Sequence, residues 1–93
     1  MTKDTIAAAL SAEGLTPTQD TFTIPEEREA IFLVAAPGDV LPVNKVIRAE
    51  LRDKYLCLHT VKDEHFCFTY DLILGLRLLA AHLGKERLAG FAK

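Results

Sequence analysis

The 93-residue sequence has no tryptophan, one methionine, two cysteines, four prolines and five glycines. Two cysteines are too few for a disulfide-stapled scaffold, so we expect a reduced, cytoplasmic protein. The small share of proline and glycine, together with 49% hydrophobic residues, excludes a collagen-like or disordered chain. No apolar run approaches the roughly 18–20 residues of a membrane span, and no basic N-terminal region precedes an apolar one. We therefore expect neither a membrane partner nor a secretory signal.

Charge of neither sign dominates the sequence. Eleven basic and thirteen acidic residues give a net charge of −2, which offers no support for binding to nucleic acid or anionic lipid. The distribution is uneven, because residues 1–40 carry two basic and seven acidic groups (−5) and residues 41–93 carry nine and six (+3). We interpret this mild basic surplus as an ordinary solvated surface.

The length predicts a single domain over residues 1–93, which begins with a helix. Residues 2–14 contain Ile6 and Leu10 at helical spacing, Thr2 or Asp4 as a cap, and Gly14 where a left-handed residue ends helices. Residues 20–70 are predicted to form a strand meander, in which Ile47, Ala49 and Leu51 point inward. Its strands are expected at residues 21–24, 30–36, 43–51, 55–61 and 65–70.

The last two strands are predicted to form a hairpin with a three-residue turn at 62–64. In this register, paired residues have numbers that sum to 126, which keeps apolar residues together on one face. These apolar residues are Leu56, Leu58, Thr60, Phe66, Phe68 and Tyr70. The opposite face then carries Cys57, His59, His65 and Cys67, with His59 directly across from Cys67.

Two thiols and two imidazoles on one strand face form a plausible zinc ligand set. However, the spacing Cys-x-His-x5-His-x-Cys matches no familiar structural zinc pattern, and a flat sheet face does not easily close a tetrahedron. We therefore predict no metal and no cofactor, and keep Cys57, His59, His65 and Cys67 as the alternative. A disulfide between Cys57 and Cys67 is not expected, because diagonal strand positions stand too far apart.

A second helix is predicted over residues 71–84, capped by Asp71 and followed by a tail at 85–93. Its first apolar stripe would cover the sheet, which gives an α+β fold: an N-terminal helix, an antiparallel sheet of four or five strands, and a C-terminal helix packed on the sheet. The second stripe has no use in a lone domain, so we expect it to bind a protein partner or a second copy. It consists of Leu74, Leu78 and Ala81.

Motifs for catalysis are missing from the sequence. It contains no glycine-rich phosphate loop and no Gly-x-Ser-x-Gly elbow, and Ser11 is the only serine. We therefore predict a non-catalytic interaction or regulatory module rather than an enzyme.

Residues 41–60 read Leu-Pro-Val-Asn-Lys-Val-Ile-Arg-Ala-Glu-Leu-Arg-Asp-Lys-Tyr-Leu-Cys-Leu-His-Thr and resemble the opening of LytTR-type DNA-binding domains of bacterial response regulators. The order of elements continues to residue 88, so the resemblance covers about half of the chain. It implies an alternative function as a nucleic-acid-binding regulatory domain that uses Lys45, Arg48, Arg52 and Lys54. The order of elements also resembles small PH-like domains. The residues that match the LytTR-type pattern are Pro42, Val46, Glu50, Tyr55, Leu58, His59 and Thr60.

Overall fold

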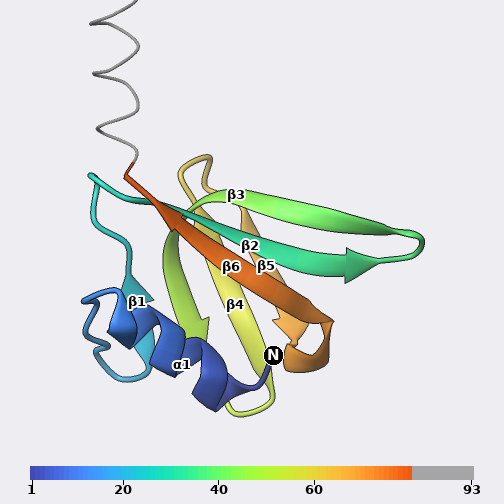
Figure 1. The fold of residues 1–93 in the computed structure, drawn as a ribbon, viewed down its shortest axis with the longest axis horizontal. Helices are drawn as coiled ribbons and strands as arrows, with labels where there is room; N and C mark the ends of the chain where they lie inside the picture. The colour runs from blue at the N-terminus through green and yellow to red at the C-terminus, as the bar shows by residue number, and fades with distance from the viewer. Residues whose placement is uncertain (81–93) are drawn as a thin grey trace, which may run out of the picture.

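The structure is a computed structural model, and it describes residues 1–80 (Figure 1). One helix is followed by six strands, with a short 3-10 turn before the last strand. The elements are α1 (Lys3–Ala12), β1 (Thr21–Thr23), β2 (Glu29–Ala36), β3 (Asp39–Leu51), β4 (Tyr55–Thr60), β5 (His65–Thr69), η1 (Tyr70–Leu72) and β6 (Ile73–Leu79).

The predicted N-terminal helix is confirmed as α1. The Thr2 side-chain oxygen accepts a hydrogen bond from the backbone N–H of Thr5 at 3.1 Å, and Gly14 has a φ of +90° just beyond the helix end. Ile6 and Leu10 are fully buried against the sheet. No helix among residues 1–80 is long and apolar enough to cross a membrane.

The six strands form one antiparallel sheet in the order β5-β4-β3-β2-β6, and β1 pairs with the end of β3. The sheet curls so that β6 passes in front of β4 and β5 in Figure 1, while α1 covers its inner face. We call the face that packs on α1 and the core the inner face, and the opposite one the outer face. Large inner-face residues include Phe22, Phe32, Val34, Leu56, Leu58 and Ile73.

Two irregularities bend β3 and change which of its side chains reach the core. Its pairing with β2 shifts between Ala30 and Phe32, and its pairing with β4 shifts between Val46 and Arg48, so β3 gains one residue at each point. An added residue reverses the inward and outward alternation beyond it. As a result Val46 is buried, whereas Ile47 is 39% exposed and the expectation that it points inward is wrong.

The β4–β5 hairpin has the predicted faces but a different register. Leu56 pairs with Phe68 and Cys57 with Cys67, so paired residues have numbers that sum to 124 rather than 126. The turn is centred one residue earlier than expected, because the Thr60 N–H donates to the Glu64 carbonyl at 3.0 Å and residues 61–63 form the turn. Within it, Asp63 adopts a left-handed φ of +64° without being glycine. The Thr60 hydroxyl also accepts the backbone N–H groups of Lys62 and Glu64, at 3.3 Å each.

The predicted helix over residues 71–84 is wrong in its described part, and residues 81–84 lie outside the described residues. Within residues 1–80 no C-terminal helix packs on the sheet; η1 leads directly into β6, which pairs with β2. The sheet of the described residues therefore has six strands instead of four or five, and residues 1–80 form a small β-rich fold with one helix. The physical reason is that β2 is apolar on both faces, so its second edge is best satisfied by another apolar strand.

Candidate functional site

The outer face of the sheet carries two distinct groups of side chains, one apolar and one rich in cysteine and histidine. Cross-strand pairs share a face, so the register identifies the members of both groups. We call the first group the apolar outer surface: Ile31, Leu33, Ala35, Val40, Pro42, Leu74 and Leu79. We call the second the Cys/His cluster: Glu50, Cys57, His59, His65 and Cys67.

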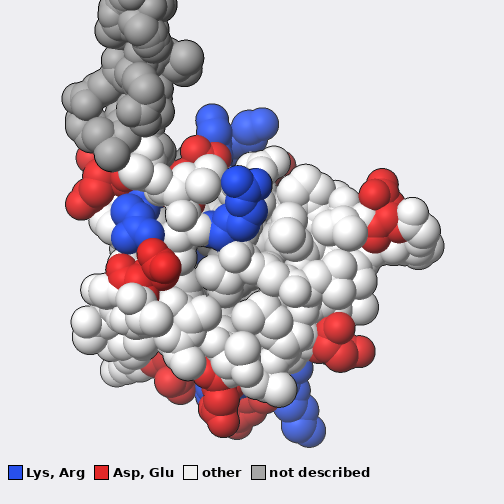
Figure 2. All heavy atoms as spheres, in the orientation of Figure 1, with Lys and Arg blue, Asp and Glu red and all other residues white. Residues whose placement is uncertain are grey.

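The apolar outer surface spans β6, β2 and the first half of β3. Leu33 lies between Pro42 on one side and Gly75 on the other, and Ala35 lies opposite Val40. Leu74 is 54% exposed, because it occupies a bulge where the β2–β6 register shifts. Figure 2 shows a broad, mostly uncharged area over β6 and the β2–β3 hairpin. Such a contiguous apolar surface is typical of a protein contact.

The residues predicted to bind a partner do not form one stripe. Leu74 is on the outer face, but Leu78 pairs with Ala30 and packs against the core, and Ala81 lies outside the described residues. Sequence reasoning missed Leu79, which is exposed on the outer face. The sequence carries no signal that singles out Leu79, because residues 73–79 are apolar at nearly every position and neither period is distinctive.

Strand β6 also forms one edge of the sheet. Among the described residues it pairs with β2 alone, so its other side presents backbone groups without a strand partner. Its sequence, Ile-Leu-Gly-Leu-Arg-Leu-Leu, contains a single charged residue, Arg77. Proteins usually protect edge strands with several charges or a proline, so a seven-residue apolar edge is a ready template for another strand.

In the Cys/His cluster, β4 and β5 bring two matched pairs together. Cys57 lies directly opposite Cys67, and His59 directly opposite His65, so the diagonal arrangement expected for the cysteines is wrong. Both cysteines are free; Cys57 is buried, while Cys67 and His65 are exposed. The Cys67 sulfur lies 3.8 Å from Nε2 of His65, and the ligand atoms of Cys57, His65 and Cys67 all lie within 4.8 Å of one another.

His59 has a different environment from the other three residues of the predicted ligand set. Its Nε2 lies 3.1 Å from Oε2 of Glu50, and its Nδ1 lies 3.2 Å from the Arg48 guanidinium. Its ring stacks on His65 with centroids 4.1 Å apart and an interplanar angle of 22°. Both of its nitrogens are therefore engaged within the protein, whereas its ring face supports the neighbouring histidine.

Glu50 is the anionic centre of this region. Its carboxylate lies 2.9 Å from the guanidinium of Arg52 and 3.5 Å from Nε of Arg48. Burial alone would raise the pKa of Glu50, but the hydrogen bond and charge of Arg52, helped by His59, hold it below the usual value. Burial, the hydrogen bond with Cys67 and the nearby Glu50 charge raise the pKa of the Cys57 thiol to about 12.

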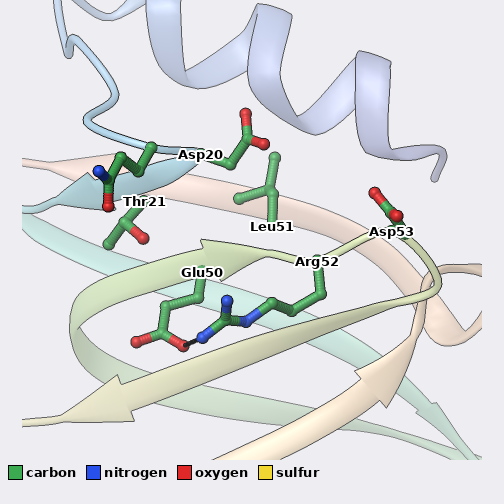
Figure 3. Close-up of a pocket in the computed structure, with 7 residues that line it drawn as sticks. Asp20, Thr21, Glu50, Leu51, Arg52 and Asp53 are labelled. Atoms are coloured by element: carbon green, nitrogen blue, oxygen red, sulfur yellow. Dashed lines mark hydrogen bonds and ion pairs between the residues drawn. The ribbon is translucent and has the colours of Figure 1, made fainter.

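A polar hollow of about 230 Å³ lies beside this anionic centre (Figure 3). Figure 3 shows Asp20, Leu51 and Asp53 on the side of the strand that faces α1, with Glu50 and Arg52 paired on the other side. Lys3 lies 3.7 Å from Asp20 and 3.6 Å from Asp53, so it balances both carboxylates. Among the described residues, every buried side-chain nitrogen and oxygen has a hydrogen-bond partner. Two exposed carboxylates of the hollow thus pair with a lysine of the same chain.

The four residues of the nucleic-acid alternative are divided between separate places. Arg48 and Arg52 converge on Glu50, so an internal carboxylate already pairs with both guanidinium groups. Lys54 precedes β4 in the sequence, whereas the Lys45 carbonyl accepts the N–H of Val61 just beyond the other end of that strand. The four cations therefore do not form one continuous patch.

No family model, curated protein or solved structure matches this chain. The resemblance to LytTR-type domains stays a prediction.

Proposed function

We propose that this protein is a non-catalytic interaction module that self-associates through the edge of β6 and the apolar outer surface. The observation that carries this proposal is that the most apolar edge strand and the exposed leucines Leu74 and Leu79 belong to the same element.

A second copy of the chain is the partner that fits this edge best. An antiparallel strand can pair with its own copy about a two-fold axis, because each strand then offers the other an identical row of backbone groups. Pairing of two β6 strands would also bring the two apolar outer surfaces next to each other. Each leucine fully buried in this way contributes about 1.5–3 kcal/mol of transfer free energy.

The proposal also agrees with the placement of charge along the edge. Arg77 is the one charged residue of β6, and it lies opposite Ile31 of β2, so no row of like charges opposes approach of a second copy. A strand protected against edge pairing would instead carry several lysines along its length.

The first experiment is sedimentation velocity of the full chain over a range of concentrations, compared with a Leu74→Glu/Leu79→Glu double variant. We expect the wild-type sedimentation coefficient to rise with concentration to that of a dimer, and the double variant to remain monomeric, because two buried carboxylates oppose assembly. Val61→Glu is the matched control, since Val61 is 57% exposed but lies in the β4–β5 turn.

We expect this control to assemble as the wild type does. A wild-type protein that stays monomeric at every concentration would contradict the proposal, as would equal loss of assembly in the Val61→Glu control. Far-UV circular dichroism of each variant verifies that it is folded.

A further inference from the structure

We propose that Cys57, His65 and Cys67 bind a zinc ion on the outer face of the sheet, with the fourth coordination position open to water or to a group from outside the chain. This site is independent of the β6 edge, because it belongs to β4 and β5 at the other side of the sheet.

The spacing of the three ligand atoms supports this assignment. Zinc–sulfur bonds of about 2.3 Å and zinc–nitrogen bonds of about 2.0–2.1 Å place tetrahedral ligands about 3.5–3.8 Å apart. The Cys67 sulfur and His65 Nε2 already stand at 3.8 Å, and all three ligand atoms lie within 4.8 Å of one another. Small side-chain rotations therefore complete the site without a change in the backbone.

The observed pairing of β4 with β5 arranges the ligands differently from the pairing predicted from the sequence. In the register predicted from the sequence, the two cysteines are diagonal. All four cysteine and histidine side chains would then have to surround one ion above a flat sheet face. In the structure, Cys57 and Cys67 are direct partners, and His65 is two residues from Cys67 on the same strand face. Three ligands at one corner with an open fourth position need no closed tetrahedron of protein groups.

The donor set points to zinc rather than to a hard cation. Two thiolates and one imidazole are soft ligands, which zinc accepts and calcium or magnesium does not. Binding would release the thiol protons to solvent, because thiolates are the ligand form. The buried Cys57 forms the floor of the site, and the exposed His65 and Cys67 leave it open to solvent.

His59 acts as a positioning residue rather than a ligand. Both of its ring nitrogens are held, by Glu50 and by Arg48, and its ring stacks on His65. The stack restricts the His65 ring, as outer-shell groups commonly do for metal-bound histidines. Glu50 therefore belongs to the support of the site rather than to its ligands.

The test uses the full chain, stripped of metal with a chelator and kept reduced with a phosphine, and titrated with Co²⁺ as a spectroscopic probe. We expect one equivalent to give thiolate charge-transfer absorption and the strong visible bands of a tetrahedral site, both removed by one equivalent of Zn²⁺. Fully reduced protein that shows no thiolate band would overturn the proposal. So would Co²⁺ absorption that one equivalent of Zn²⁺ does not displace.

Matched histidine variants distinguish the ligand from its support. We expect His65→Phe and Cys67→Ser to weaken Zn²⁺ affinity by more than the about 10–100-fold that loss of an outer-shell partner costs. His59→Phe keeps a stacked ring but has no ring nitrogen, so it should retain the thiolate band. Its Zn²⁺ affinity should fall by no more than about 10–100-fold.

Thr69→Ser is the control on the same strand and face, and it should bind as the wild type does. Retained affinity in His65→Phe, or equal loss in His59→Phe and His65→Phe, would overturn the assignment. All of these variants alter exposed or half-buried positions, and circular dichroism verifies that each is folded.

Discussion

At the scale of single residues, Tyr70 ties the end of β5 to the end of β3. Its hydroxyl donates a hydrogen bond to the carbonyl oxygen of Arg52 at 2.6 Å, and its ring packs against the core. Burial raises the pKa of Tyr70 to about 12, with a further contribution from the negative charges of Asp20 and Asp53. The neutral hydroxyl is therefore the form that the fold requires.

The Tyr70→Phe variant should lose about 1 kcal/mol of unfolding free energy at neutral pH, because one hydrogen bond is removed. The folded-state pKa lies above the unfolded value of about 10, so the stability that this group contributes is present below pH 10 and lost as pH rises towards 12. Urea unfolding at a series of pH values should thus show a steeper loss for wild type than for Tyr70→Phe.

Tyr55→Phe provides the control, since Tyr55 is 44% exposed, and its unfolding free energy should stay close to that of the wild type. Parallel pH curves for wild type and Tyr70→Phe would contradict the role of this hydroxyl.

At the scale of elements, α1 and β6 show what the sequence could and could not predict. The helix is specified by local signals, since Thr2 and Gly14 mark its two ends and Ile6 and Leu10 define its buried face. Residues 73–79 are apolar at nearly every position, so neither a period of 3.6 nor a period of two is distinctive. These residues form a strand because they pair with the free edge of β2, which lies about 40 residues earlier in the chain and cannot be seen in the local sequence.

The Cys/His cluster was predictable only in part, for a similar reason. Alternation in β4 and β5 correctly placed the cysteines and histidines on the face opposite the leucines and phenylalanines. The partner of each residue depends on the turn, where Asp63 takes a left-handed conformation and the Thr60 hydroxyl binds two backbone N–H groups. Neither feature involves a glycine that would mark the turn in the sequence. The observed register of β4 and β5 therefore differs by two residues from the predicted one.

Leu74→Glu and Leu78→Glu separate the strand from the predicted helix. On one helical stripe the two substitutions would have similar effects. In β6, Leu78 packs against the core, so Leu78→Glu should lower the unfolding free energy by about 2–4 kcal/mol, whereas Leu74→Glu should change it by no more than about 0.5 kcal/mol.

Urea unfolding at a concentration low enough to keep the wild type monomeric is the appropriate measurement, because assembly adds to apparent stability. Equal losses in the two variants would contradict the β6 assignment.

At the scale of the whole molecule, α1 packs on the inner face of the sheet, and no second helix of residues 1–80 covers the outer face. Inner-face residues such as Phe22, Phe32 and Leu56 are fully or almost fully buried with α1 against them. The outer face instead divides between an apolar surface at β6 and a Cys/His cluster at β4 and β5. One sheet thus carries two chemically different groups of side chains on its outer face.

Hydrogen exchange of the β6 amides at several protein concentrations tests the central claim of self-association most directly. In a dilute solution, the amides of residues 73–79 that point away from β2 should exchange rapidly, since no strand of the described part of the chain pairs with them there. As the concentration rises, these amides should become protected in the wild type and remain unprotected in the Leu74→Glu/Leu79→Glu variant. Exchange rates in β6 that do not change with concentration would contradict the account.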